Sequence, residues 1–110
     1  MINFEYENNK LTINENNVQL NNSIKNVVAF NDMIIVMLMD ERIPKNNIIA
    51  FDKYGNKIWD ISNIIILPQP EVYVSLSRIN ENTIKVISYF GIETYIDIRN
   101  QCIISQVFVK

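Results

Sequence analysis

Apolar and polar residues alternate along most of this chain, in short runs separated by turn-forming residues. In the first run, Ile2, Phe4 and Tyr6 occupy one side of an extended segment, and Asn3 and Glu5 occupy the other. A period of two residues predicts β-strands, because successive side chains of a strand point to opposite faces of the sheet. No segment shows a convincing helical period. The pattern predicts about ten short strands, which fall within residues 2–6, 10–13, 17–20, 24–30, 33–39, 47–52, 57–61, 72–77, 84–90, 93–99 and 102–109.

Asparagine takes the place of glycine in the predicted turns. The chain has only two glycines, Gly55 and Gly91. Asparagine tolerates the left-handed backbone conformation and bonds to its own neighbouring backbone, so clusters of it mark turns. The clearest predicted hairpin spans 47–61, and Gly55 in its turn is expected to have a positive φ. Asparagine clusters fall at 8–9, 14–17, 21–22, 46–47 and 80–82.

A pattern that occurs twice indicates a repeated meander. Phe-(Glu/Asp)-x-x-x-Asn-Lys-(Leu/Ile) stands at residues 4–11 and again at 51–58, and the two copies begin 47 residues apart. A blurred third copy lies at 98–103, and residues 31–36 align with 81–86. Periods of this length are typical of propeller blades, but a propeller takes four or more of them. The predicted fold is therefore all-β: an antiparallel meander in two blade-like repeats, forming a small barrel, sandwich or propeller-like fold.

The whole chain, residues 1–110, is expected to form a single all-β domain. Two prolines in Pro68-Gln69-Pro70 enforce an irregular connection, so a boundary between two sub-units is expected near 67–71. The charged segment 40–46 contains a proline and is expected to be a surface loop. The apolar run 33–39 is far shorter than the roughly 20 residues of a membrane-spanning helix and predicts a buried central strand.

Composition narrows the range of partners and compartments. A formal net charge of −2 argues against a nucleic-acid partner, which usually requires a basic patch. Met1 leads straight into a strand pattern with no signal peptide, so we expect a cytoplasmic protein with no membrane partner. The single cysteine, Cys102, agrees with a reducing compartment and is expected to be a small buried residue.

Candidate catalytic chemistry is sparse. The chain has no histidine, which removes the commonest general base and transition-metal ligand. It also lacks a nucleophile elbow, a glycine-rich phosphate loop and a Cys-x-x-Cys pair. Pairs of acids could in principle support glycoside chemistry, but each is more simply a solvated face or turn acid. We therefore expect no enzymatic activity, no cofactor and no metal. The acid pairs considered are Asp40 with Glu41, Asp52 with Asp60, and Glu93 with Asp97.

The aromatic residues leave binding roles open. Trp59 is expected in the core, and an exposed position would make it a binding anchor. Tyr54, at a turn tip, either lies back over the sheet or serves as a contact. Tyr73, Tyr89 and Tyr95 fall on the more polar faces of their predicted strands and could form an amphipathic patch. Residues expected to share those faces are Ser75, Ser77, Lys85, Glu93 and Arg99.

The hairpin around Gly55 resembles a known unit. Residues 49–59 combine an apolar strand, Asp52, the Gly55 turn and Trp59. This arrangement resembles the blade segment of quinoprotein-type propellers over about a dozen residues. The resemblance implies a β-hairpin of that kind and carries no cofactor with it.

In size, style of composition and this hairpin, the chain also resembles the immunity proteins that bacteria carry against polymorphic or contact-dependent-inhibition toxins. The resemblance implies one protein partner, a toxin domain such as a nuclease, whose active cleft is blocked by acidic and aromatic side chains. Two alternatives stay open: a small-molecule or carbohydrate-binding β-domain, and a module that self-associates through its sheet edges. The expected partner contacts are Asp40, Glu41, Asp52, Tyr54, Glu71 and Tyr73.

Overall fold

A computed structural model describes residues 2–39, 47–66 and 72–108 of the chain. The described residues form strands, apart from their turns and one short 3-10 helix, η1, and nearly every predicted strand is found within one or two residues of its expected bounds. The elements are β1 (Phe4–Glu7), β2 (Lys10–Ile13), β3 (Asn16–Gln19), β4 (Ile24–Ala29), β5 (Met33–Leu38), β6 (Ile48–Asp52), β7 (Lys57–Asp60), η1 (Ile61–Asn63), β8 (Tyr73–Arg78), β9 (Thr83–Ser88), β10 (Ile92–Asp97) and β11 (Cys102–Phe108).

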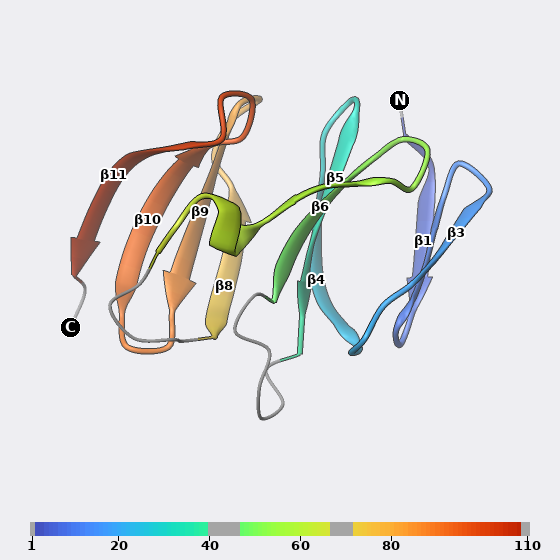
Figure 1. Cartoon of the computed structure of the whole chain (residues 1–110), viewed down its shortest axis with the longest axis horizontal. Helices are drawn as coiled ribbons and strands as arrows, with labels where there is room; N and C mark the ends of the chain where they lie inside the picture. Colours follow the sequence, from blue (N-terminus) through green and yellow to red (C-terminus); the bar gives the residue numbers. More distant parts are fainter. Residues whose placement is uncertain (1, 40–46, 67–71, 109–110) are drawn as a thin grey trace.

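Three antiparallel meanders lie side by side and account for all the described strands (Figure 1). The first sheet has three strands, β1–β2–β3, and the other two have four each, β4–β5–β6–β7 and β8–β9–β10–β11. The predicted all-β antiparallel meander is therefore confirmed, in a sandwich-like form in which no sheet of the described residues closes into a barrel. The alignment of 31–36 with 81–86 is also confirmed, because β5 and β9 are the second strands of the two four-stranded sheets.

The repeated pattern at 4–11 and 51–58 marks two hairpins, yet its copies occupy different places in them. Phe4 opens β1 opposite Ile13, whereas Phe51 stands one residue before the end of β6, opposite Lys57. The 47-residue spacing therefore does not superpose the hairpins strand for strand.

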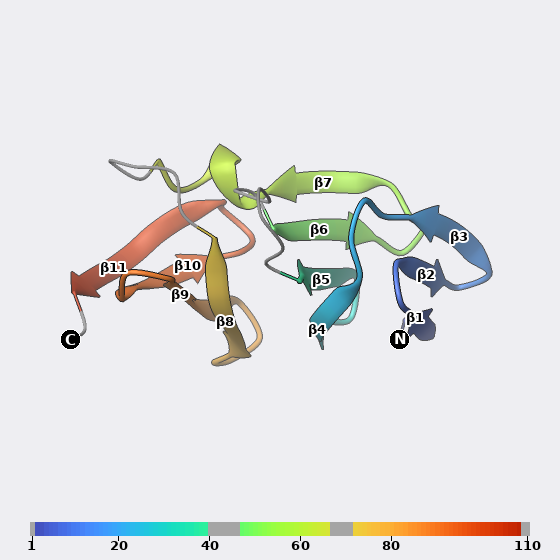
Figure 2. The ribbon, with the colours of Figure 1, turned by 90° about the horizontal axis from the view of Figure 1, so that it is seen from below.

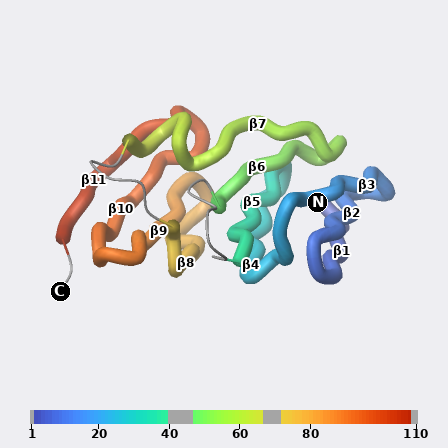
Figure 3. Tube along the Cα trace, turned by 60° about the horizontal axis from the view of Figure 1, so that its bottom comes forward, coloured from blue at the N-terminus to red at the C-terminus, as the bar shows by residue number. Residues whose placement is uncertain are grey.

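The middle sheet is enclosed between the other two (Figures 2 and 3). All six residues of β5 are buried, which confirms the predicted central strand. Met33, Ile35 and Met37 join the core shared with the third sheet. The alternate residues Ile34, Val36 and Leu38 join the core shared with the first sheet. An unbroken apolar run, in place of an alternating one, is what a strand covered on both faces requires.

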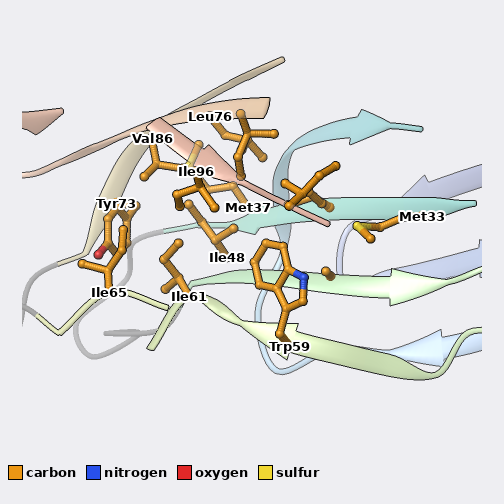
Figure 4. Packing of buried hydrophobic residues seen from close by; sticks show 14 of the residues in the cluster. Met33, Met37, Ile48, Trp59, Ile61, Ile65, Tyr73, Leu76, Val86 and Ile96 are labelled. Carbon is orange, nitrogen blue, oxygen red and sulfur yellow. The ribbon is translucent and has the colours of Figure 1, made fainter. Parts of the chain in front are cut away.

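The core between the second and third sheets contains Trp59, which points from β7 into the cluster beside Met33 (Figure 4). Its side chain is 1% exposed, so the expected core position is confirmed. The residue opposite on β6 is Ala50, whose small side chain leaves room for the indole.

Polar contacts also join these two sheets. Asn47, just before β6, is fully buried and bonds to the main chain of both Leu38 and Tyr73. At the other end of the sheets, Arg99 pairs with Asp32 at 2.6 Å and the Arg78 guanidinium lies over the Phe30 ring. Within the described ranges there is no helix long and apolar enough to cross a membrane.

Candidate functional site

The turn between β6 and β7 presents Tyr54 at its tip. One carboxylate oxygen of Asp52 accepts hydrogen bonds from the main-chain N–H groups of Tyr54 and Asn56, each at 2.9 Å. Gly55 has a φ of 85°, the left-handed conformation expected from the sequence. Tyr54 is 62% exposed, and the Lys53 ammonium lies 5.3 Å from its ring centroid. Asp52 therefore holds the turn, and Tyr54 is the exposed aromatic side chain at its tip.

The turn between β10 and β11 is built in the same way. One carboxylate oxygen of Asp97 accepts from the main-chain N–H groups of Arg99 and Asn100, and the other accepts from the Asn100 side chain. These hydrogen bonds lower the pKa of Asp97, and the bond from the Asn100 N–H makes the largest contribution. Desolvation alone would raise the pKa of Asp52, but the N–H groups of Asn56 and Tyr54 outweigh it and the pKa is lowered.

Acidification should therefore destabilise the domain through these turns. A carboxyl whose pKa is lower in the folded than in the unfolded chain contributes stability above its unfolded pKa, about 4, and that contribution is lost as the pH falls through the folded pKa. We expect constant unfolding free energy near neutral pH and a decline below about pH 4. Urea unfolding across pH measures this, and in Asp52→Asn/Asp97→Asn the decline should be shallower. If the unfolding free energy of this variant fell as steeply with acid as that of the wild type, Asp52 and Asp97 would not be the groups responsible.

The structure describes three of the six expected partner contacts, namely Asp52, Tyr54 and Tyr73. Asp40, Glu41 and Glu71 lie outside the described residues. Asp52 and Tyr54 lie together in the β6–β7 turn, where the Asp52 carboxylate is engaged in holding the backbone.

The expectation that Tyr73 lies on a polar face is wrong. Its side chain is 2% exposed and belongs to the core between the second and third sheets. The register of β8 against β9 shifts between Tyr73 and Ser75, so Tyr73 lies opposite the buried Ser88 and Leu76 opposite the buried Val86. The irregularity adds one residue to β8, and that extra residue reverses the alternation before it.

Cys102 also differs from its prediction. The cysteine is exposed, because β11 is an edge strand in which all seven residues are exposed. An apolar neighbourhood in the sequence predicted burial, but nothing described in the structure covers this strand.

Part of the predicted amphipathic patch is present on the outward face of the third sheet. Ser77 lies opposite Lys85, and Lys85 lies opposite Tyr95, all partly exposed. The Tyr95 hydroxyl donates to Glu93 at 3.0 Å, which raises the pKa of Tyr95. Arg99 does not belong to this patch, since it pairs with Asp32 of the second sheet.

The most exposed aromatic residues gather at one end of the third sheet, a grouping that the sequence did not predict. Tyr89 and Phe90, in the turn before β10, are 65% and 69% exposed, and their rings meet edge to face with centroids 5.2 Å apart. Phe108, 78% exposed, lies opposite Ile92 at the start of β10, which places it at the same end as the turn. Val107, the residue before it, is 50% exposed but points to the other face of the sheet, opposite Glu93. Tyr89, Phe90 and Phe108 are called the aromatic surface below. Its only sequence signal is the pair of aromatics directly before Gly91.

Comparison with known proteins places the chain in a family. A family model described as Domain of unknown function (DUF7957) matches residues 1–107. The chain belongs to the DUF7957 family. No curated protein matches it. Among the described residues of this DUF7957 domain, no three His, Cys, Asp or Glu side chains form a group that could hold a metal ion.

Proposed function

We propose that this chain is a non-enzymatic protein-binding module, and specifically an immunity protein that binds a cognate bacterial toxin domain and blocks its active cleft. The observation that carries the proposal is the aromatic surface. It contains two phenylalanines and a tyrosine, each about two-thirds exposed or more. Leaving this much apolar surface in contact with water is unfavourable in free energy. Aromatic side chains are also the residue type that most often dominates the energy of protein interfaces.

The surroundings of the aromatic surface fit the anatomy of an interface. Glu93, the residue after Ile92, is partly exposed and accepts a hydrogen bond from Tyr95, so polar groups lie close to the aromatic surface. A hydrophobic centre with a polar rim is typical of protein interfaces. The net charge of −2 favours association with a basic partner, and a nuclease cleft is basic. Tyr54, at the tip of the β6–β7 turn, is proposed as a separate contact.

The test is co-expression with the reading frame adjacent to this gene. That frame alone should be toxic, and the wild-type chain should restore growth and co-purify with its product. Phe90→Ser/Phe108→Ser should weaken binding by about 100-fold, because two exposed aromatic anchors are lost. Ile66→Ser is the matched control, since Ile66 is an aliphatic residue outside the aromatic surface with 92% exposure.

Each other outcome of this experiment contradicts part of the proposal. A non-toxic frame that does not bind would reject the immunity function. Binding that is lost only in Tyr54→Ala would move the interface from the aromatic surface to the β6–β7 turn.

A second candidate function, self-association, is favoured by β11. Its seven residues are all exposed and none is charged, so the edge with which no other described strand pairs lacks the charges that commonly protect edge strands. Sedimentation of the chain alone separates the two candidates, because only self-association makes its mass rise with concentration.

A further inference from the structure

The first sheet has an open edge at β1. This sheet has three strands where the other two have four. Its other edge, β3, lies against the β6–β7 turn: a Cβ added to Gly55 would lie 3.1 Å from Val18 Cγ2, and the neighbouring Asn14 side chain donates to the Lys53 carbonyl oxygen at 3.4 Å. No described strand pairs with the edge of β1 that faces away from β2.

The free edge of β1 presents main-chain hydrogen-bonding groups in a fixed order. The Asn14 N–H donates to the Asn3 carbonyl oxygen at 2.8 Å, so residues 3 and 14 form a hydrogen-bonded pair. Such pairs recur at every second residue of an antiparallel ladder, which directs the main-chain groups of Glu5 and Glu7 toward β2. The N–H and C=O groups of Phe4 and Tyr6 therefore point away from β2.

One main-chain hydrogen bond ties the turn after β1 to β4. The carbonyl oxygen of Asn8, in the turn directly after β1, accepts from the Ile24 N–H at 2.7 Å. That bond also fixes β1 beside β4, with the end of β1 at the beginning of β4 (Figure 1). The positions of Phe4 and Tyr6 on the free edge of β1 have no such neighbour among the described residues.

The side chains along this edge define what would fit. Phe4 on β1 and Val27 and Ala29 on β4 pack against the core between the first and second sheets, but are only half-buried, and Tyr6 is 46% exposed. All four residues of β1 line a hollow of about 710 Å³, together with Lys10 and Thr12. Phe4 and Tyr6 therefore leave apolar area uncovered next to main-chain groups with which no described strand pairs.

The other face of β1 is acidic. Glu5 and Glu7 are both exposed and point away from the core. Lys10 lies opposite Glu7, whereas the residue opposite Glu5 is the uncharged Thr12. A strand added beside β1 would place alternate side chains next to these two acids, and opposite charges on neighbouring strands attract.

We propose that the free edge of β1 binds an extended segment of another protein whose residues alternate between basic side chains, facing Glu5 and Glu7, and apolar side chains, facing Phe4 and Tyr6. The segment adds a fourth strand to the first sheet through main-chain hydrogen bonds to Phe4 and Tyr6. This site does not include the aromatic surface and does not depend on the toxin hypothesis.

The test uses a capped synthetic heptapeptide of alternating lysine and valine, with a glutamate–valine peptide as its counterpart. Amide hydrogen exchange followed by NMR reports each main-chain N–H separately. The lysine peptide should slow exchange at Phe4 and Tyr6 by about tenfold, with little change at Glu5 and Glu7, which already bond to β2. The glutamate peptide should have no effect.

Two variants separate the backbone from the charge. Tyr6→Pro removes an edge-facing N–H without removing a β1–β2 hydrogen bond, a position where a strand tolerates proline. It should weaken peptide binding at least tenfold, whereas Tyr6→Ala, which keeps the N–H, should weaken it less. Glu5→Lys/Glu7→Lys changes only exposed side chains and should reverse the preference toward the glutamate peptide.

Three outcomes would overturn the proposal. Equal binding of both peptides would remove the charge argument, and peptide-induced protection elsewhere in the chain would place the site on another edge. Protection of Phe4 and Tyr6 that rises with protein concentration and without peptide would make the occupant a second copy of this chain.

Discussion

Asn47→Ala is expected to lower the free energy of unfolding by about 3 kcal/mol, because it removes three buried hydrogen bonds at once. The Asn47 amide nitrogen donates to the carbonyl oxygens of Leu38 and Tyr73, at 3.1 and 2.9 Å, and its oxygen accepts from the Tyr73 N–H at 2.9 Å. The side chain is fully buried, so water cannot readily replace it. Leu38 ends β5 and Tyr73 begins β8, so this one amide ties the second sheet to the third.

Thermal and urea denaturation of the two proteins measure the effect. A loss of this size should lower the melting temperature by roughly 10–20 °C in a domain of this length. Asn21→Ala is the control, since Asn21 is exposed, and it should change the free energy by less than about 0.5 kcal/mol. If the two variants are equally stable, Asn47 does not hold the sheets together.

Trp59→Ala is expected to cost about 4 kcal/mol, whereas Trp59→Phe should cost less than half of that. The alanine variant loses a large side chain that is 1% exposed and leaves a cavity between two sheets. The phenylalanine variant keeps most of the apolar volume. It also loses no hydrogen bond, because the Trp59 Nε1 atom has no hydrogen-bond partner among the described residues and is itself buried.

Urea unfolding followed by far-UV circular dichroism compares the variants, since Trp59 is the only tryptophan and fluorescence would be lost with it. Ile58→Ala controls for a change in the same strand, because Ile58 is 38% exposed. A phenylalanine variant as unstable as the alanine variant would show that the indole N–H makes a stabilising contact, for example with a buried water.

The strands were predictable because their signal is local. The alternating residues 10–13 form β2, which has one face buried. The unbroken apolar run 33–39 contains β5, which is buried on both faces. The positive φ of Gly55 was likewise predictable from the turn residues around it. These features depend on neighbours within a few residues, which the sequence displays directly.

The candidate site was less predictable, since exposure depends on which sheets cover which strands. Tyr73 was assigned to a polar face by alternation, but the irregularity in β8 reverses the alternation there. Phe108 and Cys102 lie in sequence surroundings that favour burial, yet no described element covers β11. Asn47 opens a predicted strand next to an asparagine cluster typical of turns, yet it is a buried link between two sheets.

The amino-acid pattern alone specifies a meander of short antiparallel strands with one strand buried on both faces. Periodicity and turn residues encode this, because each strand and turn is specified by its own few residues. The stacking of three sheets with the second in the middle, and the joining of the second sheet to the third by Asn47 and Trp59, emerge only in the folded molecule. The same holds for the aromatic surface and the β1 edge, which no described element covers. Those features arise from contacts between residues far apart in the chain, and alternation within one strand cannot specify which other sheet will cover it.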